Sequence, residues 1–230
     1  ARIGDVAVHL NRYPDRDALK LRGELARYIT TQTGVSLSAA NIWPANGSNE
    51  VIQSIFLAFG ESALGFVPSY TMHALIARVA DVEWIEGERN PDFTLNTEAA
   101  LAAIAEQKPS LTFITTPNNP TGSALRLSDI EALAIATARV RGLLVVDEAY
   151  AEFSNEASAV TLIERHPNVL VVRTMSKAFA FAGARLGYLV ADPKVVEALQ
   201  LVRLPYHLSV LTQVAAEVAL EFQDQLLSEV

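Results

Sequence analysis

The sequence contains no cysteine, few lysines and no run of 18 or more apolar residues. Without cysteine there is no disulfide framework, thiolate nucleophile or zinc–thiolate cluster, and we expect no metal site. The short apolar runs argue against a membrane partner, and no signal peptide is visible. The net charge of −8 at pH 7 argues against nucleic acid as a partner. These absences predict a soluble, cytoplasmic protein that builds any anion site locally.

Strand-like apolar segments alternate with helical patterns along the 230 residues, half of which are hydrophobic. This alternation predicts a three-layer α/β/α fold, in which helices cover both faces of a mostly parallel sheet. The predicted strands are 63–67, 82–85, 111–115 and 143–146, with two more near Val169 and Tyr188. Among the predicted helices are 51–59, 193–203 and 209–222.

Lys177 differs from the other three lysines in its sequence context. Lys20, Lys108 and Lys194 lie in a helical pattern, in a loop and at a helix start, where solvated charges are common. Small and aromatic residues surround Lys177 in the sequence. We therefore expect Lys177 to be desolvated, which would disfavour its ammonium form and lower its pKa. An amine of this kind can form a Schiff base with an aldehyde.

Hydroxyl groups and a fixed positive charge lie close to Lys177 in the sequence. Thr174, Ser176 and Arg185 form a set that suits a phosphate dianion. An aldehyde that carries a phosphate is pyridoxal 5'-phosphate (PLP). The plainer interpretation is a lysine at the rim of a sheet beside an ordinary surface arginine.

Further polar residues lie at or just after the carboxyl ends of predicted strands, where open α/β sheets bind ligands. Asp147 ends a buried strand, where a carboxylate needs a partner such as a protonated pyridine nitrogen. Asn119 and Tyr150 could bind the ring oxygen of PLP, and Tyr70 could stack on its ring. Taken singly, these residues could equally be a strand-end cap, a turn asparagine and core-edge tyrosines.

Several motifs together resemble the fold-type I PLP-dependent aminotransferases, and within them the histidinol-phosphate aminotransferases of actinobacteria. The resemblance covers nearly the whole chain. The motifs that carry it are Asn11-Arg12-Tyr13-Pro14, Asn119-Pro120-Thr121-Gly122, Asp147-Glu148-Ala149-Tyr150, Arg173-Thr174-Met175-Ser176-Lys177-Ala178-Phe179 and Leu204-Pro205-Tyr206-His207-Leu208-Ser209.

The resemblance implies catalytic roles for Lys177, Asp147 and Tyr70. Lys177 would be the Schiff-base lysine and the base for the proton shift, Asp147 would hold the pyridinium, and Tyr70 would stack on the ring. His73 would contact Asp147 from behind, or it is simply a histidine on a helix face. The cofactor-binding residues it implies are Gly47, Ser48, Asn49, Tyr70, Asn119, Asp147, Tyr150, Thr174, Ser176, Lys177, Arg185 and Tyr13.

The resemblance also implies a homodimer, in which Tyr13 reaches the phosphate site of the neighbouring subunit. We expect residues 1–14 at the dimer interface, residues 15–222 as the PLP-binding large domain, and residues 223–230 as the start of a truncated small domain. The arginines that bind the substrate phosphate would lie in that small domain. Arg173 and Arg203 are expected to be surface charges.

The implied reaction is transamination between L-histidinol phosphate and 2-oxoglutarate, which gives imidazole-acetol phosphate and glutamate in histidine biosynthesis. Alternatives of the same fold are an aromatic amino-acid aminotransferase and a threonine-phosphate decarboxylase-like enzyme. A non-catalytic PLP-binding module is an alternative of another class.

Overall fold

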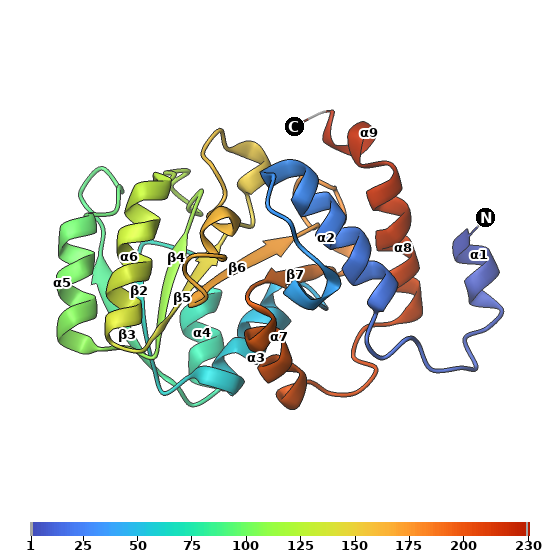
Figure 1. Ribbon diagram of the computed structural model, residues 1–230, viewed down its shortest axis with the longest axis horizontal. Helices are drawn as coiled ribbons and strands as arrows, with labels where there is room; N and C mark the ends of the chain where they lie inside the picture. The colour runs from blue at the N-terminus through green and yellow to red at the C-terminus, as the bar shows by residue number, and fades with distance from the viewer. Residues whose placement is uncertain (1, 229) are drawn as a thin grey trace.

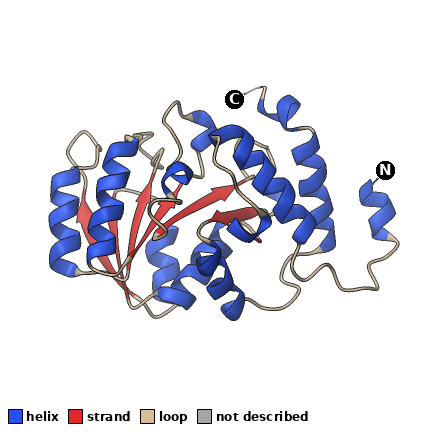
Figure 2. Ribbon diagram, in the orientation of Figure 1, coloured by secondary structure: helices blue, strands red, loops and turns tan. Residues whose placement is uncertain are grey.

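The computed structural model describes residues 2–228 and 230, which form helices on both sides of a seven-stranded sheet (Figures 1 and 2). The strands are β1 (Ile42–Ala45), β2 (Ser62–Val67), β3 (Glu83–Glu88), β4 (Leu111–Thr115), β5 (Leu143–Asp147), β6 (Val169–Thr174) and β7 (Gly187–Val190). The α-helices are α1 (Arg2–Ala7), α2 (Leu19–Thr33), α3 (Ser48–Phe59), α4 (Met72–Val79), α5 (Thr97–Gln107), α6 (Leu127–Arg139), α7 (Pro193–Val202), α8 (Val210–Glu221) and α9 (Gln223–Leu227).

The sheet has the strand order β1-β7-β6-β5-β4-β2-β3, and all its pairs are parallel except the two made by β7. β4, β5 and β6 are buried along nearly their whole length, as expected for parallel strands covered on both faces. The predicted α/β fold with a mostly parallel sheet is therefore confirmed.

Two apolar layers hold the helices on the sheet. One layer joins the sheet to α2, α5, α6 and α8, and the other joins it to α3, α4 and α7. Side chains alternate between the two layers along each strand, so that Val171 faces the first layer and Val172 the second. Because of this alternation, side chains two residues apart on a strand face the same layer.

The strand β1 is absent from the sequence predictions. It is only four residues long and contains Pro44, which cannot donate a backbone hydrogen bond and is rare inside strands. It forms as an edge strand paired antiparallel to β7, with Ile42 opposite Val190 and Ala45 opposite Gly187. The edge strand β1 leads directly into the turn at Gly47.

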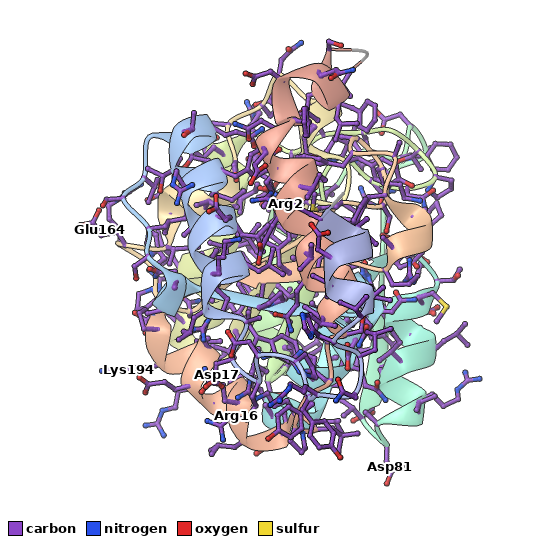
Figure 3. All side chains as sticks on the ribbon, turned by 90° about the vertical axis from the view of Figure 1, so that its right-hand side faces the viewer. Arg2, Arg16, Asp17, Asp81, Glu164 and Lys194 are labelled. Carbon is purple, nitrogen blue, oxygen red and sulfur yellow. The ribbon has the colours of Figure 1, made fainter. Side chains whose placement is uncertain are left out.

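The N-terminal helix α1 lies at the side of the molecule against α8 (Figure 1). None of its residues is buried, and Arg2, which is labelled in Figure 3, lies on this helix. Arg2 forms an exposed ion pair with Glu221 of α8. Figure 3 also shows Arg16 and Asp17 side by side, and these two residues form an ion pair where the chain enters the body of the fold. Within the described part of the chain, no helix is both long and apolar enough to cross a membrane.

Candidate active site

One cavity of about 180 Å³ at the carboxyl edge of the sheet brings together ten of the twelve predicted site residues. They come from the N-terminus of α3, the loops after β2 and β4, the last residue of β5 and the loop after it, and the last residue of β6 with the segment that leads to β7. The ten are Ser48, Asn49, Tyr70, Asn119, Asp147, Tyr150, Thr174, Ser176, Lys177 and Arg185. Thr115, Ala149 and Ala182, which the sequence did not single out, complete the lining.

The carboxylate of Asp147 is buried and has two partners. Asp147 Oδ2 lies 2.9 Å from Nε2 of His73, and Asp147 Oδ1 accepts a hydrogen bond of 3.1 Å from the backbone N–H of Ala149. Both the aspartate and histidine side chains are 3% exposed. Of the two interpretations of His73, the structure supports contact with Asp147. A buried carboxylate held in this way can face a cationic group in the cavity.

Lys177 follows the end of β6, and its Nζ lies 5.5 Å from the centre of the Tyr150 ring. The expectation that Lys177 is desolvated was wrong, because the residue is exposed to solvent. The neighbours that suggested burial, Met175, Ala178 and Phe179, are themselves buried, whereas the side chain of Lys177 between them faces solvent. Local sequence therefore identified the lysine but misjudged its depth. Among the described residues no carboxylate forms an ion pair with Lys177.

The backbone at the start of α3 forms a cradle beneath Arg185. Gly47 has a positive φ of 84°, and an added Cβ there would lie 2.4 Å from Nη2 of Arg185. The guanidinium can lie this close because glycine has no side chain. Gly187 on β7 packs equally closely against the other side of this turn, with the backbone nitrogen of Ser48 only 2.2 Å from the position of an added Cβ. Free N–H groups of a helix N-terminus and a guanidinium together suit a phosphate.

Hydrogen bonds tie the remaining walls of the cavity together. The hydroxyl of Tyr70 donates to Oδ1 of Asn49 at 3.2 Å, and the Tyr70 ring meets His73 edge-on. The buried Asn118 accepts a bond of 2.7 Å from the Ser69 hydroxyl and donates to the backbone of Pro68 at 3.1 Å. It thereby joins the loop that carries Tyr70 to the loop that carries Asn119.

This donor set fits PLP. The cradle at Gly47 and Arg185 offers a place for its phosphate, Lys177 an amine for its aldehyde, and Asp147 a carboxylate for its ring nitrogen. The three groups project into the same cavity from the carboxyl edge of one sheet.

A family model described as "Aminotransferase class I and II" matches residues 7–230. The chain belongs to this aminotransferase family. The histidinol-phosphate aminotransferase of Nocardia farcinica is 56% identical over 229 residues, which cover 98% of this chain and 59% of that relative. The relative of the same name from Mycobacterium leprae is 55% identical, and the match covers 98% of this chain and 60% of that relative. This chain thus spans about three fifths of the length of the curated relatives it matches.

A solved structure of the same fold contains the cofactor. The histidinol-phosphate aminotransferase of Sinorhizobium meliloti, solved in complex with pyridoxal-5'-phosphate, matches this chain with a TM-score of 0.87 and 28% identity. The match covers 97% of this chain and 60% of that one. The resemblance stated from the motifs is therefore confirmed.

Tyr13 and Gly47 are the two predicted site residues that do not line the cavity. Gly47 lies directly beneath Arg185, as described above. Tyr13 is 80% exposed and stacks on the ring of Tyr206, with the ring centres 4.5 Å apart. The role of Tyr13 remains a prediction.

The expectation that Arg173 and Arg203 are surface charges was wrong. Arg173 is 3% exposed and pairs with Glu148 and Glu152 behind the sheet. The side chain of Arg203 is 9% exposed and pairs with Asp17. Both arginines lie near the end of a strand or helix, as predicted. They are buried because carboxylates from other segments of the chain pair with them, and the pattern of one strand or helix does not predict such partners.

Proposed function

We propose that this chain is the PLP-binding part of an aminotransferase that converts L-histidinol phosphate and 2-oxoglutarate into imidazole-acetol phosphate and glutamate, in the cytoplasm and within histidine biosynthesis. The convergence of Lys177, Asp147 and Arg185 on one cavity carries the proposal. The names of relatives at 55–56% identity support the choice of substrate.

When bound, PLP supplies an aldehyde that captures amines and a ring that withdraws electrons from the adjoining carbon. The amine of Lys177 would hold the aldehyde, and once released it would carry a proton between the two carbons that exchange the amino group. Its exposure at the mouth of the cavity suits this second task, because the side chain is free to turn towards the substrate.

Asp147 would keep a proton on the ring nitrogen. The carboxylate can do this because His73 and the N–H of Ala149 fix its orientation while burial excludes water. Asn119 and Tyr150 would bind the ring oxygen, and Tyr70 would stack on the ring. The residues proposed to surround the phosphate are Gly47, Ser48, Asn49, Thr174, Ser176 and Arg185.

The substrate phosphate would be bound by groups outside residues 1–230. It is a dianion, and it needs cations that are not already paired. Arg173 and Arg203 already pair with carboxylates, and Arg185 is assigned to the cofactor phosphate. We therefore propose that arginines of a small domain, of which residues 223–230 form the beginning, complete the substrate site beside the large domain of residues 15–222.

We further propose a homodimer in which residues 1–14 form part of the interface and Tyr13 reaches the partner's phosphate site. The exposed apolar side chains of Val8, Leu10 and Tyr13 in this segment support the proposal. A second copy of the chain would cover them.

The substrate is tested with the full-length PLP-loaded protein by measuring kcat/KM for histidinol phosphate and for phenylalanine. We expect a clear preference for histidinol phosphate, and no turnover by the Lys177→Ala control. Equal use of both donors, or a preference for phenylalanine, would instead identify an aromatic amino-acid aminotransferase. Release of carbon dioxide from threonine phosphate would identify a decarboxylase.

A further inference from the structure

A buried ion-pair cluster lies behind the site and takes no part in the proposed reaction. Nε of Arg173 donates to Oε2 of Glu148 at 2.8 Å, and Nη1 of Arg173 donates to Oε1 of Glu152 at 3.2 Å. All three side chains are 3–4% exposed. None of them lines the cavity that holds the site residues.

The cluster is nevertheless one residue away from the site on two neighbouring strands. Glu148 directly follows Asp147 at the end of β5, and Arg173 directly precedes Thr174 at the end of β6. β5 and β6 are hydrogen-bonded neighbours, with Asp147 in register with Val172. The ion pair therefore bridges the two strand ends from which Asp147 and the segment of Lys177 project.

Strand alternation places the ion pair and the site on opposite faces of the sheet. Asp147 contacts His73 of α4, which belongs to the layer of α3, α4 and α7. Glu152 of the cluster instead accepts a bond of 3.2 Å from the hydroxyl of Tyr28, on α2 in the other layer. Changes at the cluster can therefore reach the cavity through the backbone at the ends of β5 and β6, and through the turn from Glu148 to Glu152 that carries Ala149 and Tyr150.

Glu148 is held in one orientation. Its Oε1 accepts a bond of 2.7 Å from the N–H of Ala159, and its Oε2 accepts the Ser158 hydroxyl at 2.8 Å as well as Arg173. Its own N–H donates to the carbonyl of Val172 on β6 at 2.9 Å. Charge-assisted bonds from a planar guanidinium fix direction as well as distance.

Stability alone does not account for this arrangement. Burial opposes the charge on Arg173, but the attraction of Glu148 and Glu152 outweighs it and raises the pKa of Arg173 above its ordinary value. Two carboxylates share this one cation, and Oε2 of Glu152 has no hydrogen-bond partner among the described residues. Well-packed apolar side chains often stabilise a fold as well as a buried ion pair does. Unlike a guanidinium–carboxylate pair, however, they do not fix the relative orientation of the two strand ends.

We propose that Glu148 and Arg173 are positioning residues, which set the spacing between Asp147 and the Thr174–Lys177 segment and thereby the affinity for PLP. The inference rests on the proposed function, because this spacing matters only if both strand ends hold one cofactor.

The test compares two identical changes in the full-length protein. Arg173→Lys keeps the positive charge but removes the planar guanidinium that bonds to Glu148 and Glu152. Arg203→Lys makes the same change in the ion pair with Asp17. A displacement of 1 Å can reduce catalysis by about 100-fold, so we expect Arg173→Lys to raise the Kd for PLP and to lower kcat by up to about that factor. Arg203→Lys should leave both values, and the absorption spectrum of bound PLP, unchanged.

A triple variant covers the case in which Arg173→Lys does not fold. Glu148→Gln and Glu152→Gln with Arg173→Met remove all three charges, so that no buried carboxylate is left unpaired. This variant should fold, yet it should bind PLP as weakly as the single variant. The inference is overturned if Arg173→Lys, or the triple variant, binds PLP with the unaltered affinity and spectrum and only melts at a lower temperature. If the unaltered protein binds no PLP, the proposed function fails, and the inference fails with it.

Discussion

Replacing Gly187 by alanine should damage the phosphate cradle through a backbone collision. An added Cβ would lie 2.2 Å from the backbone nitrogen of Ser48 and 2.4 Å from the carbonyl carbon of Gly47. Non-bonded atoms prefer separations of about 3.5 Å, so the turn must move by more than about 1 Å. Neither atom belongs to a side chain that could rotate away. Overpacking of this kind costs about 1–3 kcal/mol of folding free energy.

The displaced turn carries the N–H groups proposed to bind the phosphate, so PLP affinity should fall by up to about 100-fold. Urea unfolding without PLP measures the loss of stability, and titration of the PLP absorbance measures the affinity. The matched control is Gly183→Ala, because nothing lies within 4 Å of an added Cβ there and the backbone suits alanine. That change should stabilise the fold by up to about 1 kcal/mol and leave PLP binding unchanged. If Gly187→Ala binds PLP as tightly as this control, the proposed phosphate cradle is wrong.

Two further predictions concern the dimer and the stability in acid. Tyr13→Ala chains mixed with Lys177→Ala chains should regain activity, because one site of each hybrid dimer would contain neither defect; a full-length protein that sediments as a monomer would contradict this. The hydrogen bond from Arg203 lowers the pKa of Asp17, so the ion pair stabilises the fold above about pH 4 and its contribution disappears as the pH falls through the lowered pKa. Asp17→Asn should therefore reduce the free energy of unfolding by less than about 1 kcal/mol at neutral pH, and by nothing in strong acid. Urea unfolding at both pH values checks this, and a difference that grows in acid would show that the sign is wrong.

The sequence alone was enough to predict the layered fold and to select most of the residues of the site. Buried parallel strands read as continuous apolar runs, and their carboxyl ends meet at one edge of the sheet. Polar residues that follow such runs, as Asp147 and Asn119 do, must therefore lie near each other whatever the details of packing. The apolar runs predicted the strands, and the polar residues that follow those runs along the chain predicted the site.

Only the tertiary structure decided which side chains are buried and what they touch. The sequence around Lys177 suggested burial and that of Arg173 suggested exposure, and the structure shows the reverse. The reason is that burial depends on segments distant in sequence, such as Glu148 and Glu152 against Arg173. The contact between His73 and Asp147 likewise joins residues 74 positions apart. Local pattern determines which face of an element a residue occupies, whereas the partner on that face is fixed only when the layers pack.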